Sequence, residues 1–100
     1  GHTDEAFCCR HVSNVDDLAK AVEAFDPEYV ARRARVDARA VTAAAELFGA
    51  AKRGSAGTGT GPNMAPHSML TEHLALSLNA ICGRVNQVGD YLESGYFLSP

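Results

Sequence analysis

A glycine-rich stretch between two amphipathic helix patterns is the feature that most constrains the fold of this chain. Residues 54–67 contain four glycines and two prolines, and Gly57, Gly59 and Gly61 stand at alternate positions. Ser55–Thr58 is long enough to form a short strand, but its small residues and glycine disfavour a stable one. Alternating glycines let a backbone turn tightly and come close to a ligand. We therefore expect a connection between helices that also has the means to bind a ligand.

The helix pattern after this stretch runs from about Ser68 to Arg84. Five large apolar residues recur at helical spacing and predict a face turned toward a core: Leu70, Leu74, Leu78, Ile81 and Val85. Gly83 is a position at which this helix can end early. Glu72 is assigned to a favourable interaction with the helix dipole in the first turn, rather than to acid–base chemistry.

Two shorter helix patterns lie near the start of the chain. Residues 15–25 place apolar side chains on one face at helical spacing, which predicts an amphipathic helix. A second, short helix is expected over residues 28–35. Asp26 is a suitable N-cap for it, and Pro27 fits the first helical position.

A third helix has the clearest start signal, because Asp37 precedes an apolar periodic pattern. Lys52 and Arg53 are expected in its last turn, with Gly54 directly after it. Residues 86–100 are expected to form an extended loop. As an isolated piece, the chain is therefore predicted to be mainly α, with about four helices and at most one or two short strands.

Charge and cysteine content exclude several classes of function. The net charge is −3 with both signs mixed, so nucleic acid and anionic membranes are not expected partners. The three cysteines lack Cys-x-x-Cys spacing and form no disulfide framework, zinc or iron–sulfur signature. We expect free thiols in a reducing, cytoplasmic location. No apolar run approaches the ~20 residues that a membrane-spanning helix needs.

The remaining polar clusters are assigned to structure. His67 and His73 have no third ligand nearby, so no metal site is expected. No residue is assigned a catalytic role. A basic cluster is assigned to a solvated face or to a contact with the rest of a longer polypeptide, rather than to nucleic acid: Arg32, Arg33, Arg35 and Arg39.

Residues 57–64, called the glycine loop below, do not satisfy two common phosphate-binding patterns. A P-loop requires Lys at the position of Thr60, and a dinucleotide fingerprint requires a third glycine at the position of Met64. From the residues alone, the glycine loop is either a plain connection between helices or a ligand loop at the carboxyl end of a strand.

Several segments together resemble the molybdopterin oxidoreductases, the large molybdenum or tungsten enzymes related to formate dehydrogenase, nitrate reductase and dimethyl sulfoxide reductase. Phe25–Val30 is similar to a proline-started short helix of that family. Gly59–Met64 resembles its G-x-G-x-x-Q loop, with Met64 in place of Gln. Leu78–Asn86 resembles its Leu-Asn-x-x-x-Gly helix end. The order and spacing of these pieces extend the resemblance over nearly the whole chain.

This resemblance implies that the chain is a fragment of such an enzyme, from a Rossmann-like α/β domain that holds molybdopterin guanine dinucleotide with Mo or W. The implied cofactor-binding residues are Gly59, Thr60, Gly61, Asn63 and Met64. The metal ligand and the iron–sulfur cysteines lie elsewhere in such proteins. The isolated chain is therefore expected to bind no cofactor and to have no redox activity. Its implied partner is the remainder of the polypeptide.

Further expectations concern the chain as a separate molecule. Gly1-His2 resembles a remnant of tag cleavage, which leaves residues 3–100 as the fragment of the cofactor-binding domain. Apolar faces that would pack on a missing sheet predict a homodimer. Two alternatives to the cofactor role stay open. One is a small helical protein-interaction module without a cofactor, and the other is a regulatory nucleotide-binding domain.

Overall fold

The structure is a computed structural model that describes residues 2–85 and 87–89. This part of the chain is mainly helical, with six helices and no strand. In chain order the helices are α1 (Glu5–His11), α2 (Val15–Val22), α3 (Pro27–Ala34), α4 (Ala38–Ala50), α5 (Thr60–Asn63) and α6 (Ser68–Ile81). The expected mainly-α architecture is confirmed for the described residues. The sequence patterns do not predict α1 and α5.

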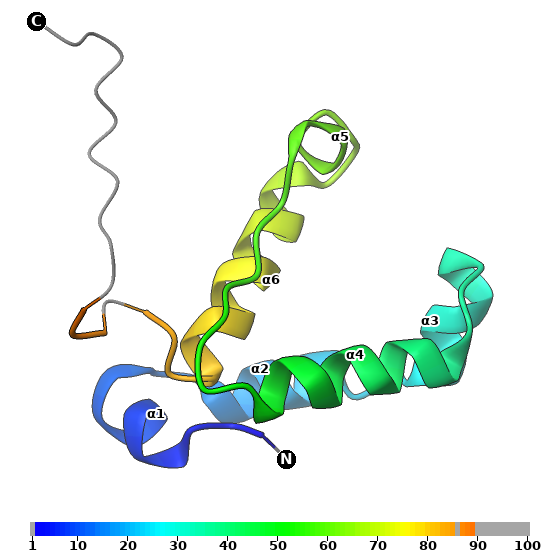
Figure 1. Ribbon diagram of the computed structural model, residues 1–100. Helices are drawn as coiled ribbons and strands as arrows, with labels where there is room; N and C mark the ends of the chain where they lie inside the picture. The colour runs from blue at the N-terminus through cyan, green and yellow to red at the C-terminus, as the bar shows by residue number, and fades with distance from the viewer. Residues whose placement is uncertain (1, 86, 90–100) are drawn as a thin grey trace, which may run out of the picture.

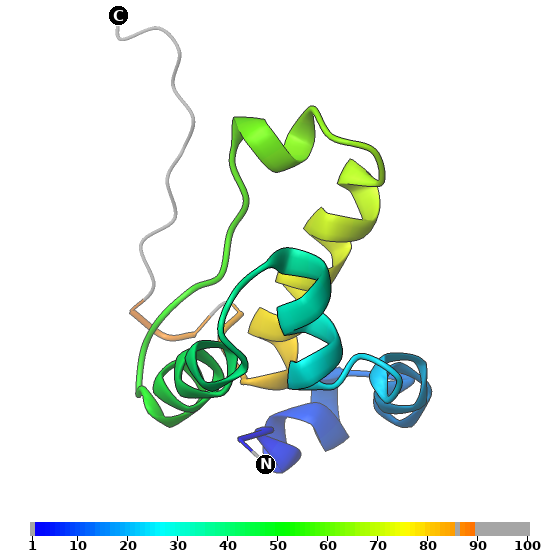
Figure 2. The ribbon, with the colours of Figure 1, turned by 90° about the vertical axis from the view of Figure 1, so that its right-hand side faces the viewer.

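The helices form an open frame rather than closed layers. In Figure 1, α2 and α4 lie across the base, α3 stands at one end of them, and α6 rises from the base toward α5. Figure 2 separates α2 from α4 and shows them on either side of the lower end of α6. α1 and α5 pack on α6, and α3 packs on α4. Because α6 spans the molecule, it connects the glycine loop at one end with α1 and α4 at the other.

Asp26 and Asp37 cap their helices as predicted. The backbone N–H of Tyr29 donates to Asp26 Oδ1 at 2.6 Å, and the N–H of Arg39 donates to Asp37 Oδ1 at 2.8 Å. Pro27 occupies the first turn of α3. The first N–H groups of a helix have no partner inside it, so a preceding Asp satisfies a local need that is visible in the sequence.

The two unpredicted helices are short. Asp4 caps α1 by accepting a hydrogen bond from the Phe7 N–H at 2.9 Å. Glu5 in the first turn and His11 in the last turn suit the helix dipole. With seven residues in α1 and four in α5, neither helix is long enough to show apolar periodicity. This is why the sequence pattern does not predict them.

Two predicted helices end earlier than expected. α2 stops at Val22 instead of continuing to residue 25. α4 stops at Ala50, so Lys52 and Arg53 lie beyond it and not in its last turn. The predicted end of α4 is therefore wrong. The helix ends at Ala50 because Arg84, which is distant in the sequence, binds the last carbonyl groups of α4 in place of a local cap.

Arg84 fastens the end of α4 to the end of α6. Its Nη2 donates to the carbonyl oxygen of Phe48 and to that of Ala51, the latter at 2.7 Å, with a longer contact of 3.5 Å to the Gly49 oxygen. Its Cζ atom also lies 4.1 Å from the centroid of the Phe48 ring. A cation at this place opposes the negative end of the helix dipole and gains a cation–π contact.

Gly83 turns the chain sharply, so α6 stops short of its expected end. Its φ of +64° lies in the left-handed region that favours glycine. The Gly83 N–H donates to Ala80 O at 3.0 Å and the Arg84 N–H donates to Asn79 O at 2.9 Å, which is the Schellman pattern of helix C-termini. A Cβ at Gly83 would also lie 2.7 Å from Asp4 Oδ2. Backbone conformation and the approach of α1 both require glycine here.

The predicted apolar face of α6 exists, but the described residues do not cover it. Leu70, Leu74 and Leu78 are 55%, 42% and 39% exposed. In the described part of the chain, Cys8 is the one buried hydrophobic residue and Asn79 is the one buried polar residue. The helices are therefore held more by caps and side-chain hydrogen bonds than by a closed core.

None of the helices within residues 2–85 and 87–89 has the length and apolar character needed to cross a membrane. Most of the extended loop expected over residues 86–100 lies outside the described residues.

Candidate functional site

The glycine loop contains α5 and lies against the start of α6, at the upper end of the molecule in Figure 1. Gly59 is the N-cap of α5, and the next four residues form its single turn. All five of the predicted cofactor-binding residues lie together on this turn and are exposed: Gly59, Thr60, Gly61, Asn63 and Met64. They form one contiguous surface at the tip of α6.

The chain itself does not require glycine at three positions of this loop. Gly57, Gly59 and Gly61 all lack the positive φ that favours glycine, and Gly59 is in extended conformation with φ −136° and ψ −170°. A Cβ placed on any of the three would meet no described atom within 4 Å. They contrast with Gly83, where conformation and packing both exclude a side chain.

The loop offers hydrogen-bond donors without a charged side chain. In the part of the chain that the structure describes, the N–H groups of Thr60 and Gly61 and the Thr60 hydroxyl have no hydrogen-bond partner. Pro62 has no N–H group. None of the residues 57–64 is acidic or basic. The exposed turn is thus suited to donate hydrogen bonds to neutral acceptor atoms of a ligand that comes close to its backbone.

Thr58 connects the loop to α6. Its hydroxyl lies 3.0 Å from Asn63 Oδ1 and also forms a short hydrogen bond with the Glu72 carboxylate. A hydroxyl has one proton, so the carboxylate and the amide compete for it unless the Asn63 amide is turned to donate its NH2 group. Asn63 and Glu72 are therefore used to hold the loop, although Asn63 was assigned by resemblance to the cofactor.

The assignment of Glu72 to the first helical turn is wrong. α6 begins at Ser68, and no acidic residue lies in its first turn. Glu72 lies in the second turn, where it accepts the hydrogen bond from Thr58. Sequence spacing did not predict this pairing, because the two residues belong to different elements and are 14 positions apart.

Asn79 binds the extended segment that leads into the loop. Its Oδ1 accepts a hydrogen bond from the Ala56 N–H at 2.7 Å, and its Nδ2 donates to the Ala56 carbonyl oxygen at 2.8 Å. The side chain amide thus pairs with both backbone groups of one residue, as a neighbouring strand would. The segment expected to form a short strand, Ser55–Thr58, is held to α6 by this amide and is not paired with another strand. The signal for this role in the sequence is a single polar residue, Asn79, between apolar neighbours near the helix end.

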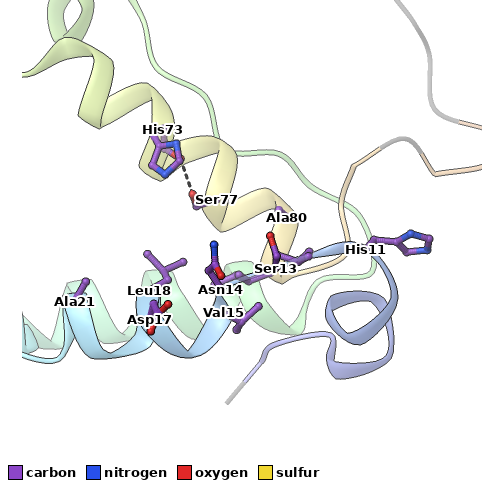
Figure 3. A pocket seen from close by; sticks show the side chains of 12 residues that line it. His11, Ser13, Asn14, Val15, Asp17, Leu18, Ala21, His73, Ser77 and Ala80 are labelled. Carbon is purple, nitrogen blue, oxygen red and sulfur yellow. Dashed lines mark hydrogen bonds between the residues drawn. The ribbon is translucent and has the colours of Figure 1, made fainter.

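Several cavities adjoin α6. One of about 350 Å³ lies beside the glycine loop, between α5 and the first turns of α6. Its lining is Asn63, Ser68, Met69, Glu72, His73 and Leu76. A larger cavity of about 600 Å³ lies between the α1–α2 connection, α2 and the lower half of α6 (Figure 3).

Two histidines, His11 and His73, line the larger cavity, but their rings do not come together. Figure 3 shows His11 turned away from the cavity, and its ring lies in a tilted contact with Phe7, with centroids 4.9 Å apart and an interplanar angle of 49°. His73 lies on α6 at the other side, where its carbonyl oxygen accepts a hydrogen bond from the Ser77 hydroxyl at 2.8 Å. The cavity therefore does not bring its histidines together for acid–base or metal chemistry.

Metal-ligating side chains are dispersed in the described ranges. Within residues 2–85 and 87–89, no group of three or more His, Cys, Asp or Glu side chains could hold a metal ion. His67 is the N-cap of α6 with a φ of +64°.

Comparisons with protein-family models, with curated proteins and with solved structures found no match for this chain.

Proposed function

We propose that this chain is part of a molybdopterin oxidoreductase and forms one wall of its cofactor site. In this proposal the glycine loop contacts molybdopterin guanine dinucleotide through Gly59, Thr60 and Gly61, with Asn63 and Met64 beside them. The cofactor, when bound, supplies electron or oxygen-atom transfer at molybdenum or tungsten. The chain supplies the shape and the hydrogen bonds of one wall and has no redox activity alone.

The observation that carries this proposal is the presence of glycines that the chain itself does not need. Gly59 and Gly61 have ordinary backbone conformations and open space where a Cβ would stand. A glycine costs conformational entropy on folding, so it is favoured where something else must come close to the backbone. A pterin or guanine ring system with its polar edges fits that requirement, and the free N–H groups of Thr60 and Gly61 provide donors.

The uncovered apolar side chains support a larger assembly. Leu70 and Leu74 on α6 and Val22 on α2 are each more than 40% exposed. Burying an apolar side chain contributes about 1.5–3 kcal/mol, so such faces are normally covered. In the proposal the remainder of the polypeptide covers them, with the helices packed on the sheet of a Rossmann-like α/β domain.

Changing Gly59 and Gly61 together to Val in the full-length protein is expected to lower its molybdenum or tungsten and pterin content at least tenfold. No described atom outside the local backbone lies within 4 Å of a Cβ at either position, so the substitution is expected to act on a bound group rather than on packing within the chain. Overpacking a contact costs about 1–3 kcal/mol for each site, which corresponds to roughly 5- to 150-fold in affinity. Metal analysis and pterin fluorescence of the purified protein measure the effect.

Ala65→Val is the matched control for this experiment. Ala65 is exposed and directly follows the loop, so the added methyl groups should leave cofactor content unchanged. A double glycine variant that retains normal cofactor content would overturn the proposal and favour the linker alternative. Circular dichroism of the variants checks that the helices are still formed.

The helical interaction module remains a second candidate, because one specific observation favours it. Met69, Leu76 and Leu47 are 86%, 64% and 78% exposed, and large exposed apolar side chains mark protein–protein contacts. In that case the partner of α6 is another protein or a second copy, and the glycine loop is a linker.

The chain alone is expected to form a dimer as its concentration rises, through the uncovered face of α6. Sedimentation equilibrium should show the average mass increasing toward that of a dimer. The double variant Leu70→Glu with Leu74→Glu should keep the chain monomeric. The control Thr42→Glu changes an exposed residue on α4 and should dimerise like the unaltered chain. A monomer at millimolar concentration would contradict the expected dimer.

A further inference from the structure

The three cysteines lie in different surroundings. Cys8 is on α1 and only 6% exposed, Cys9 beside it is exposed, and Cys82 is the half-buried C-cap residue of α6. α1 is fixed against the end of α6 by two contacts to one carbonyl group. The Ile81 oxygen accepts a hydrogen bond from the Asp4 N–H at 2.8 Å and one from Cys8 Sγ at 3.6 Å.

These contacts limit the distance between the two less exposed cysteines. The Ile81 carbonyl belongs to the peptide bond that joins Ile81 to Cys82, and this bond is trans. In a trans peptide the carbonyl oxygen lies about 2.8 Å from the next Cα, so Cys8 Sγ lies within about 6.4 Å of the Cys82 Cα. Disulfide-bonded cysteines have their Cβ atoms about 3.5–4.5 Å apart. Rotation of the Cys82 side chain and a shift of α1 toward it would be needed to reach that geometry.

The surroundings also determine which thiol reacts first. Burial raises the pKa of the Cys8 thiol, and the nearby charges of Asp4 and Cys82 raise this pKa further. Cys8 is therefore protonated at neutral pH and poorly nucleophilic. Of Cys8 and Cys82, Cys82 is the more accessible, so it reacts with a reagent from solution before Cys8 does.

We propose that Cys8 and Cys82 form an intramolecular disulfide that joins α1 to the end of α6 when the chain meets a small-molecule disulfide. This makes the junction of the two helices an oxidation-sensitive modification site, independent of the role of the glycine loop. Cytosolic disulfides are usually transient and redox-sensing, and this one would be reversible in a reducing compartment.

The reaction consists of two exchange steps and uses oxidised glutathione as its oxidant. The Cys82 thiolate attacks one glutathione sulfur, which forms a mixed disulfide and releases a glutathione thiolate. Cys8 then loses its proton, and its thiolate attacks the Cys82 sulfur and displaces the second glutathione thiolate. Both released thiolates take up the protons that the two cysteines lost. Overall, two cysteine thiols are oxidised and one glutathione disulfide is reduced to two thiols.

The test is to equilibrate the full chain with a glutathione redox buffer, alkylate the free thiols and digest with trypsin. Cleavage after Arg10, Arg53 and Arg84 gives one peptide of residues 1–10 and one of residues 54–84. Mass spectrometry should find these two peptides linked in the wild-type chain and in Cys9→Ser, the matched control. The linked pair should be absent in Cys8→Ser and in Cys82→Ser.

A second measurement on the wild-type chain does not depend on whether the variants fold. In the same redox buffer with 6 M guanidinium, the ratio of linked to unlinked chain should fall at least about tenfold, because the folded contacts raise the effective concentration of the two thiols. A link that persists in Cys8→Ser, a link between Cys8 and Cys9, or an equal yield in denaturant would overturn the proposal. So would a chain that carries only glutathione mixed disulfides.

Discussion

Asn79→Leu is expected to lower the free energy of unfolding by about 2–5 kcal/mol. The amide of Asn79 is 8% exposed and pairs with both the N–H and the C=O of Ala56. Leucine has a similar volume but no hydrogen-bonding atoms, so two partly buried backbone groups lose their partners. Each unsatisfied group costs about 1–3 kcal/mol. Urea unfolding followed by circular dichroism measures the change.

Ser77→Ala on the same helix is the matched control. The Ser77 hydroxyl donates to the His73 carbonyl oxygen of its own helix, and that oxygen belongs to the helix ladder as well. Its removal should change the free energy of unfolding by less than about 0.5 kcal/mol. Hydrogen exchange gives a local readout, because the Ala56 amide should exchange much faster in Asn79→Leu and normally in Ser77→Ala. Equal protection of Ala56 in both variants would contradict the assigned role of Asn79.

Asn79 also connects stability with the candidate site. It holds Ala56 against α6, and two residues later Thr58 bonds to Glu72 and lies against Asn63 of α5. The glycine loop is therefore positioned by side chains of α6 rather than by a paired strand. If the proposed function is correct, Asn79→Leu in the full-length protein affects the cofactor wall through the path of the chain before the loop.

The elements that the sequence predicts correctly depend on local interactions. Asp26 and Asp37 bond to N–H groups two or three residues away, and the chain needs no other part of the molecule to form these caps. The apolar period of α6 likewise depends on residues three and four positions apart, and its helix is confirmed up to Ile81. Caps and apolar periodicity can therefore be recognised within one short segment of the sequence.

The elements that it does not predict depend on contacts between distant positions. The end of α4 is set by Arg84, which is 33 positions from Ala51. The segment before the glycine loop is held by Asn79, 23 positions from Ala56. Composition and apolar periodicity do not predict contacts between such distant positions. The five predicted site residues do come together on the turn of α5, but only because all of them lie within residues 59–64 of the chain.

Arg84→Met is expected to lower the free energy of unfolding by about 2–4 kcal/mol. The guanidinium donates to carbonyl oxygens at the end of α4 and lies over the Phe48 ring, with Cζ 4.1 Å from the centroid. A hydrogen bond from a charged donor contributes about 1.5–3 kcal/mol, and an exposed cation–π contact contributes about 0.5–1 kcal/mol. Met keeps most of the aliphatic length but loses the charge and the donors. Urea unfolding should show a lower midpoint with an unchanged slope.

Two further variants separate the geometry of Arg84 from its charge alone. Arg84→Lys keeps the charge but replaces the planar fork by a single ammonium group, so about half of the loss is expected. Lys52→Met removes an exposed charge just beyond α4, at a position that sequence reasoning places in the last turn of the helix. It should change the free energy of unfolding by less than about 0.5 kcal/mol. If Lys52→Met proved as damaging as Arg84→Met, the charge near the helix end would matter more than the fork that binds its carbonyls.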